Sequence, residues 1–287
     1  MNGLLLSVAL LLAAAPVVKG PVQTAHRRSP YVGAVAVEHP SGRVLLRDNE
    51  TAECYPASCT KLMTARLLLK AVRSGAVKRD ELLVQSRRSA AEQPSKIDLM
   101  PGETISVTNA MKALMLKSAN DVAVIIAERL GGTVEGFAKM MNDEAKALGM
   151  TSTTFVSPNG LPPPKGSKRG FDRSTAADLA KLGAAILREQ PEILEYTRLA
   201  SATVPGRKGL PLTLQNHNNV LWKKGVKMPG VDGLKTGYID AGGSSIVLTG
   251  TRNGKRAIVV VVGASSARER EENAGRMLRD ALDALSW

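Results

Sequence analysis

The sequence predicts an α+β fold in which strands from both ends of the chain form one antiparallel sheet around a helical middle. Apolar runs of strand length lie near the N-terminus at residues 32–37 and 43–46. Three more follow residue 203, at 233–238, 244–251 and 256–262. The stretch between these two groups has the composition of helices, so we expect a helical insertion between the strands of one sheet.

Turn-forming residues separate the predicted strands. Residues 39–42 read His-Pro-Ser-Gly and predict a hairpin between the first two strands. Asn253-Gly254, between the last two strands, is a strong hairpin signal because this pair readily adopts the positive φ of a tight turn. Residues 157–170 are rich in Pro and Gly and predict a long loop.

Helices are predicted in segments rich in Ala, Leu, Lys and Met. Pro56 and Ser58 stand before such a run and mark a helix start. Ser174 is placed to cap another helix, which runs to about residue 188. The complete set of predicted helices spans residues 58–72, 106–131, 134–148, 174–188 and 273–285.

The charge of the chain bears on its partners. It contains 287 residues with 39 Lys and Arg against 26 Asp and Glu, a formal net charge of +13. Such a surface attracts polyanions, for example nucleic acid or anionic cell-wall material. The charge could also do no more than keep the protein soluble. The chain has no zinc-finger pattern, aromatic RNA-binding motif or basic helix followed by heptads, so we expect no nucleic-acid partner.

The two cysteines, Cys54 and Cys59, are five positions apart, and Cys59 falls in a predicted helix. A disulfide between them would be strained, so we expect two thiols. The chain has three histidines but no His-x-x-x-His or Cys-x-x-Cys pattern, so we expect no metal site.

The N-terminal segment predicts export. Residues 4–15 form an apolar run of 12 residues that is too short to span a bilayer comfortably and has the length of a signal-peptide core. We expect residues 1–25 to be a signal peptide, with cleavage after Ala15, Gly20 or Ala25 left open. No second long apolar run follows, so the mature chain is expected to have no transmembrane helix. It would be secreted across the inner membrane and act in the periplasm or facing the cell wall, as a soluble or peripheral protein.

Ser58 and Lys61 place a hydroxyl and an amine on one face of a helix start. The unpaired N–H groups and the positive end of the helix dipole favour a developing oxyanion there. Lys61 can take the proton of Ser58 only if burial or another cation keeps the amine neutral. Alone this motif arises about once by chance in a chain of this length, and by itself it is more often an ordinary helix cap followed by a solvated lysine.

Ser118 and Asn120 interrupt an otherwise apolar stretch, where buried polar groups need partners. The pair reads either as a helix junction or as a site in which Ser118 relays protons and Asn120 binds a substrate amide. Lys235, Thr236 and Gly237 lie on a predicted strand flanked by glycines. Gly237 would let a substrate backbone approach the strand, Thr236 could hold a terminal carboxylate, and Lys235 could supply the cation that depresses the pKa of Lys61.

The order of the three motifs decides between these interpretations. Ser-x-x-Lys, Ser-x-Asn and Lys-Thr-Gly, in this order, are typical of penicillin-binding proteins and class A β-lactamases. Here they begin at Ser58, Ser118 and Lys235 and fall at a helix start, between helices and on a strand, as that chemistry needs. We therefore expect Ser58 to be an acylated nucleophile.

Residues 56–65, 114–121 and 232–238 closely resemble the D-alanyl-D-alanine carboxypeptidases among the low-molecular-mass penicillin-binding proteins, and the similarity extends over residues 30–285. This resemblance implies a penicillin-binding/β-lactamase-like fold, with an antiparallel sheet flanked by helices and an all-α subdomain beside the cleft. Residues 26–287 would be the catalytic domain, with a helical insertion at about 86–200.

The resemblance further implies a serine D,D-carboxypeptidase that removes the terminal D-Ala from peptidoglycan stem peptides through an acyl-enzyme, without a metal or organic cofactor. β-Lactam antibiotics would inhibit it covalently. The backbone N–H groups of Ser58 and Tyr238 would form the oxyanion hole, and Arg270 would help to bind the substrate carboxylate. Two positions depart from the family pattern, Ala119 for a frequent Gly and Cys59 for an aliphatic residue, and neither removes a reacting group.

Three other functions remain open at this stage. The chain stops at Trp287 without the C-terminal β-rich domain of many relatives, and shorter relatives include D,D-endopeptidases that cut cross-links. A class A β-lactamase would need a Glu-x-x-Leu-Asn run between Asn120 and Lys235, and none occurs. A non-catalytic wall-binding protein of the same fold would usually have lost a reacting group, whereas all are present here.

Overall fold

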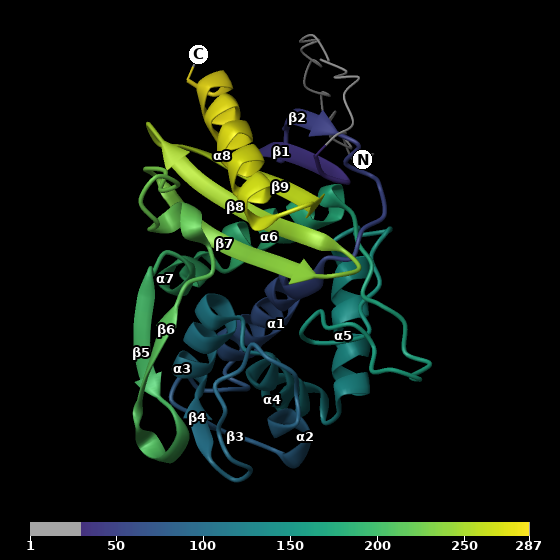
Figure 1. Ribbon diagram of the computed structural model, residues 1–287, viewed down its shortest axis with the longest axis vertical. Helices are drawn as coiled ribbons and strands as arrows, with labels where there is room; N and C mark the ends of the chain where they lie inside the picture. The colour runs from purple at the N-terminus through teal and green to yellow at the C-terminus, as the bar shows by residue number, and fades with distance from the viewer. Residues whose placement is uncertain (1–29, 287) are drawn as a thin grey trace, which may run out of the picture.

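The computed structural model describes residues 30–286, so the predicted signal peptide lies outside the described residues. Five strands form one antiparallel sheet in the order β2-β1-β9-β8-β7, with the two N-terminal strands at one edge and β7 at the other (Figure 1). The strands are β1 (Gly33–His39), β2 (Val44–Asp48), β7 (Val231–Ile239), β8 (Gly243–Arg252) and β9 (Lys255–Ala264). The predicted α+β fold, with strands from both ends of the chain in one sheet, is confirmed.

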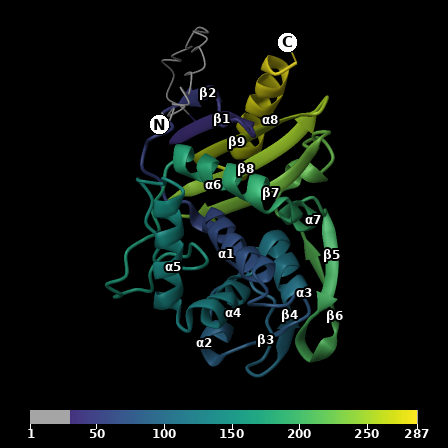
Figure 2. The same ribbon diagram turned by 180° about the vertical axis from the view of Figure 1, so that it is seen from behind.

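Helices cover both faces of this sheet. Helix α8 (Ala267–Ala284) packs on one face, and α6 (Ala176–Glu189) packs on the other, as the two opposite views show (Figures 1 and 2). Because β9 is buried on both faces, its run from residue 257 to 262 is continuously apolar rather than alternating. Gly183 allows α6 to approach the sheet closely, since a Cβ there would lie 3.3 Å from the Val247 side chain.

The helical region lies below the β7 edge of the sheet in Figure 1. Besides the predicted helices, it contains the short hairpin of β3 and β4, and a second hairpin of β5 and β6 leads back to the sheet. Its elements are α1 (Lys61–Arg73), β3 (Leu82–Val84), α2 (Arg87–Ala90), β4 (Thr104–Ser106), α3 (Val107–Lys112), α4 (Asn120–Gly131), α5 (Val134–Ala147), η3 (Pro191–Ile193), α7 (Leu194–Thr197), β5 (Ser201–Pro205), η4 (Arg207–Gly209), β6 (Pro211–Gln215) and η5 (Asn219–Leu221). No helix within residues 30–286 combines the length and apolar character that a membrane crossing requires.

The single helix predicted over residues 106–131 is wrong. The chain instead forms α3, a π-helical turn η2 (Ala113–Lys117), a break at Ser118 and Ala119, and then α4. Two other helix starts shift by a few residues: Thr175 rather than Ser174 caps α6, and Ser266 caps α8 well before the predicted residue 273.

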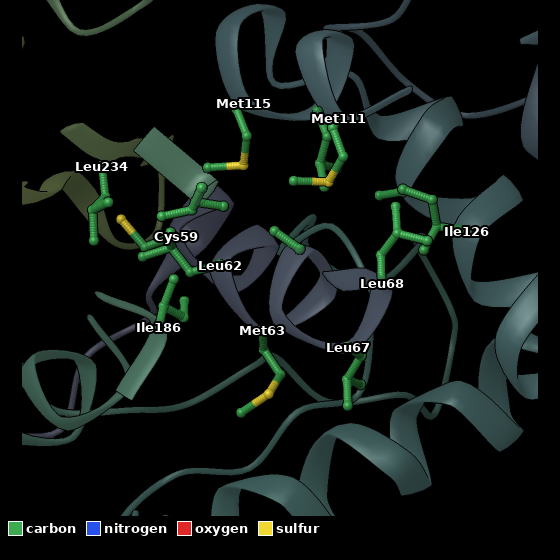
Figure 3. Packing of buried hydrophobic residues seen from close by; sticks show 14 of the residues in the cluster. Cys59, Leu62, Met63, Leu67, Leu68, Met111, Met115, Ile126, Ile186 and Leu234 are labelled. Atoms are coloured by element: carbon green, nitrogen blue, oxygen red, sulfur yellow. The ribbon is translucent and has the colours of Figure 1, made fainter. Parts of the chain in front are cut away.

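Helix α1 runs through the centre of the larger apolar core. Its side chains point outward on all sides into contact with neighbouring helices and with the sheet, as Figure 3 shows for Leu62, Met63 and Leu68. The only two cysteines, Cys54 and Cys59, are buried free thiols, as predicted. Burial raises the pKa of the Cys59 thiol to about 11 and that of Cys54 to about 12, so both groups are neutral core residues.

Candidate active site

A cleft lies where strand β7 faces the helical region. Seven of the nine predicted site residues contribute to its wall, and Lys61 and Lys235 are buried behind them. The residues that line it are Ser58, Pro94, Ser95, Ser118, Asn120, Leu161, Gln215, Asn216, His217, Asn219, Trp222, Thr236, Gly237, Tyr238, Ala267 and Arg270.

Ser58 lies in a 3₁₀ turn, η1 (Ala57–Thr60), directly before α1. Ala57 has a φ of +49°, a left-handed conformation that a non-glycine residue adopts only under constraint from its surroundings. Gly160, itself at φ +81°, supplies part of this constraint, because a Cβ at residue 160 would collide with the carbonyl oxygen of Ala57. The close approach of Gly160 to the Ala57 backbone therefore helps to hold Ser58 at the cleft.

Lys61 is completely buried, and its Nζ contacts three oxygen atoms. It lies 2.9 Å from Ser58 Oγ, 2.7 Å from Asn120 Oδ1 and 2.7 Å from the backbone oxygen of Asn159. A neutral amine has two N–H donors and one lone pair. The carbonyl oxygens of Asn120 and Asn159 only accept hydrogen bonds, so they take the two N–H groups. The lone pair is then left for the O–H of Ser58, which is the arrangement that a general base requires.

The electrostatics of the site favour that neutral state. Burial lowers the pKa of Lys61 well below its ordinary value, and the positive charge of Lys235 lowers it further. Lys235 is also buried, and burial lowers its pKa to about 8. Its Nζ donates to the backbone oxygen of Thr236 at 2.9 Å. The surroundings of Lys61 therefore favour the neutral amine that can accept a proton from Ser58.

The break between η2 and α4 creates the Ser118–Asn120 part of the site. Ser118 has a φ of +60° and lines the cleft, and its buried Oγ has no hydrogen-bond partner among residues 30–286. The orientation of the Asn120 amide is determined by its Nδ2, which donates to the backbone oxygen of Gln93 at 2.9 Å. Its Oδ1 therefore faces Lys61, and the hydroxyl of Ser118 remains available to a ligand in the cleft.

Strand β7 approaches η1 so closely that only glycine fits at residue 237. A Cβ there would lie 2.8 Å from the oxygen of Pro56 and 3.0 Å from the backbone nitrogen of Ser58. The structure thus gives a different reason for Gly237 than the expected approach of a substrate backbone. Thr236 and Tyr238 flank it on the cleft wall, and the Tyr238 hydroxyl donates to Asp240 at 2.7 Å.

Arg270 extends from the first turns of α8 to the cleft. Its guanidinium is buried, with one nitrogen 2.8 Å from Glu271 Oε1, which also accepts from Asn219 at 2.8 Å. The buried Nε of Arg270 has no hydrogen-bond partner in the part of the chain that the structure describes. An unpaired cationic donor in the wall of a cleft suits an anionic ligand group such as a carboxylate.

A family model described as D-alanyl-D-alanine carboxypeptidase matches residues 24–266. The chain belongs to this family. The matched region contains the segments of Ser58, Ser118 and Lys235, and Arg270 lies just beyond it.

Relatives of this carboxypeptidase family extend the comparison. The D-alanyl-D-alanine carboxypeptidase DacF of Bacillus subtilis is 33% identical over 245 residues, which are 85% of this chain and 60% of that protein. The chain thus spans about three fifths of the length of this curated relative and of DacD from Escherichia coli, at 61%.

Solved structures of the family share the fold. DacD of Francisella tularensis gives a TM-score of 0.83 at 25% identity, over 94% of this chain and 74% of that one. Penicillin-binding protein D2 of Listeria monocytogenes, in its cefotaxime-bound form, gives 0.75 at 33% identity, over 88% and 97%. The expected penicillin-binding fold is thereby confirmed.

Several residues of this carboxypeptidase-family site were missed by sequence reasoning. Asp172 is buried and accepts hydrogen bonds from the hydroxyls of Thr60 at 3.1 Å and Ser157 at 2.8 Å, so it ties the loop 157–170 to the turn of Ser58. Thr64 donates to the backbone oxygen of Pro158 at 2.6 Å. The only available signal was the Pro-Asn-Gly-Leu run at 158–161. Nothing in the neighbouring sequence shows that this run contacts and supports Lys61.

Replacement of Gly160 tests this support. We expect Gly160→Ala to destabilise the protein by about 1–2 kcal/mol for the positive φ and by about 1–3 kcal/mol more for the collision with Ala57. Gly166→Ala is a matched control, because Gly166 lies in the same loop with a φ of +79° but has open space at its Cβ position. Thermal or urea unfolding checks the difference. Equal destabilisation by the two substitutions would contradict the proposed support of the Ser58 turn.

Proposed function

We propose that the protein is a serine-type D-Ala-D-Ala carboxypeptidase, which removes the terminal D-Ala from peptidoglycan stem peptides through an acyl-enzyme on Ser58. The observation that carries this proposal is the position of the buried Lys61 Nζ, 2.9 Å from Ser58 Oγ and 2.7 Å from the oxygens of both Asn120 and Asn159. In its neutral form this amine donates to the two carbonyl oxygens and turns its lone pair to Ser58. Serine is a poor nucleophile until a base takes its proton, and this geometry supplies the base.

In the acylation step, Lys61 takes the proton of Ser58 while Ser58 Oγ attacks the carbonyl carbon between the two D-Ala residues. The backbone N–H groups of Ser58 and Tyr238 stabilise the oxyanion of the tetrahedral intermediate. The hydroxyl of Ser118 gives its proton to the departing amine of D-Ala and takes in return the proton that Lys61 received from Ser58, so Lys61 is neutral again. The peptide C–N bond breaks, and the shortened stem peptide remains as an ester of Ser58.

In the second step, water attacks this ester and Lys61 accepts a proton from the water. Lys61 returns this proton to Ser58 Oγ, which leaves as the hydroxyl, and the peptide is released with a new carboxylate. Each step uses side chains and backbone groups of the chain itself.

Substrate specificity rests on the end of the cleft where Thr236 and Arg270 lie. The hydroxyl of Thr236 and the unpaired Nε of Arg270 are suited to the terminal carboxylate of the stem peptide. Asn120 binds a substrate amide in addition to its contact with Lys61. The names of the curated relatives, D-alanyl-D-alanine carboxypeptidases, support the same substrate class.

Defined muropeptides test the proposed reaction. We expect free D-Ala from a linear pentapeptide and no product with the Ser58→Ala variant. Splitting of cross-linked dimers without release of D-Ala from pentapeptide would replace the carboxypeptidase by a D,D-endopeptidase. If neither substrate is consumed and no penicillin is bound covalently, the chain is a non-catalytic wall-binding protein.

β-Lactams are proposed to acylate Ser58 and to be released slowly. The family relative from Listeria monocytogenes has been solved with cefotaxime and with ampicillin bound, which supports β-lactam binding. Among the described residues, no Asp or Glu lines the cleft, so no carboxylate stands ready to activate a deacylating water. We expect a fluorescent penicillin to remain attached for minutes or longer after the free reagent is removed. Rapid hydrolysis of a penicillin would contradict this expectation.

We also propose that the protein acts outside the cytoplasm, after removal of a signal peptide within residues 1–25, because its substrate is cell-wall peptide. Residues 26–287 would then form the catalytic domain with the helical insertion at about 86–200. Cell fractionation with an antibody to the folded domain tests the location.

A further inference from the structure

Lys61 Nζ contacts the carbonyl oxygens of two asparagines, Asn120 and Asn159, and one loop holds both of these residues in place. This loop, residues 92–95, follows α2 and borders the cleft through Pro94 and Ser95. The backbone oxygens of Gln93 and Ser95 accept from Asn120, at 2.9 Å from its side chain and 2.7 Å from its backbone nitrogen. The carboxylate of Glu92 accepts from Asn159 Nδ2 at 3.1 Å.

We propose that Glu92 is a positioning residue, whose carboxylate holds Asn159 against Lys61 and adds a negative charge to the cationic surroundings of that amine. This inference rests on the proposed function of Lys61 as the base for Ser58. Glu92 does not line the cleft, so it acts through Asn159 and through its electric field rather than by touching the substrate.

The contacts of Asn159 leave little freedom for this residue. Its side chain is buried, its Oδ1 accepts from the Leu161 backbone at 3.0 Å, and its Nδ2 donates to Glu92. Its backbone oxygen lies 2.7 Å from Lys61 Nζ. The side-chain amide is therefore fixed at both ends, and the end that donates depends on the carboxylate of Glu92.

The charges around Lys61 show what Glu92 contributes. The titratable groups that face Lys61 from the packed elements, besides Glu92, are Lys235 from β7, Asp172 from the segment before α6, Cys59 from η1 and His217 from the loop after β6. Cys59 is neutral because burial raises the pKa of its thiol to about 11, and Asp172 is already surrounded by four hydrogen-bond donors. The carboxylate of Glu92 accepts one hydrogen bond, from Asn159, and faces the cations Arg88 and Arg169 in addition to Lys61.

The direction of the effect follows from the charges. Burial raises the pKa of Glu92, and its negative charge raises the pKa of Lys61 against the opposite effects of burial and Lys235. Removal of the Glu92 charge lowers the pKa of Lys61. Lys61 must be neutral to accept the proton of Ser58, so the acylation rate falls at low pH, and this fall is the acidic limb of the pH–rate profile. Without the Glu92 charge, the acidic limb should move to lower pH.

The experiment compares Glu92→Gln with Glu128→Gln in the full chain. Glu128 is also partly buried in the helical region and faces Arg88, but its carboxylate accepts from Ser86 and contacts no partner of Lys61. Acylation by a fluorescent penicillin is measured from pH 4 to pH 10 in each variant. We expect Glu92→Gln to move the acidic limb down by roughly 0.5–1 pH unit, and Glu128→Gln to leave it in place.

A second variant separates the charge from the hydrogen bond. Glu92→Gln removes the negative charge but keeps an oxygen that accepts a hydrogen bond from Asn159. Glu92→Ala removes the charge and the hydrogen bond, so it should also lower the maximal acylation rate by about tenfold. An acidic limb in Glu92→Gln that coincides with wild type overturns the inference, provided that wild type is labelled and Ser58→Ala is not. Absence of labelling in wild type itself would instead overturn the proposed function.

Discussion

Replacement of Lys61 by arginine should abolish acylation while leaving the fold intact. The guanidinium of an arginine stays charged at every accessible pH, so it has no lone pair for the proton of Ser58. Loss of a general base typically lowers a rate by about 10²- to 10⁴-fold. Here we expect the upper part of that range, because within residues 30–286 Lys61 is the one group whose amine contacts Ser58 Oγ. Stopped-flow or gel-based labelling with a fluorescent penicillin measures the effect.

Lys70→Arg is the matched control for this substitution. Lys70 lies on the same helix, is largely exposed and pairs with Glu144 at 2.5 Å, a contact that arginine preserves. Its labelling rate should remain that of wild type. Retained labelling in Lys61→Arg would contradict the assignment of the base and would direct attention to another group near Ser58.

Removal of the Lys235 cation should shift acylation in the direction opposite to that of Glu92→Gln. Without this positive charge the pKa of Lys61 rises, so a smaller fraction of Lys61 is neutral at a given pH. We expect Lys235→Gln to move the acidic limb up by about one pH unit, which lowers acylation by roughly tenfold at pH values below the pKa of Lys61. In wild type, the Lys235 pKa of about 8 should produce an alkaline limb near that pH.

Lys255→Gln makes the same chemical change on the same sheet at an exposed position. It should leave both limbs of the profile unchanged. A Lys235→Gln profile with its acidic limb at the wild-type pH would show that Lys235 does not set the protonation of Lys61, and would limit its role to the hydrogen bond with Thr236.

The sheet and the three motif segments could be predicted from the sequence because their signals are local. The hairpin pair Asn253-Gly254, the apolar strands and the motifs at Ser58, Ser118 and Lys235 each depend on neighbouring residues. The structure brings these segments to one cleft, in the manner that their order implied. The hairpin of β5 and β6 was missed, since Pro205 and Pro211 at its ends argue against strands in isolation.

The interruption of the helix at Ser118 was indicated by the Ser-x-Asn motif and not by helix propensity. Residues 113–117, Ala-Leu-Met-Leu-Lys, are strong helix formers, so local propensity favours an unbroken helix. The break is held instead by distant groups: the backbone of Asn120 donates to Ser95, and that of His217 donates to the oxygen of Leu116 at 3.2 Å. Likewise, Asn159 reaches Lys61 across 98 positions of sequence, a distance over which no periodicity carries information.

The identity of the acylated residue tests the account most directly. Wild-type protein and the Ser58→Ala variant are incubated with benzylpenicillin, digested, and analysed by peptide mass spectrometry. We expect one penicilloyl adduct on the peptide that contains Ser58 in wild type, and no adduct in the variant. An adduct on any other residue, or an equal adduct in Ser58→Ala, would contradict it.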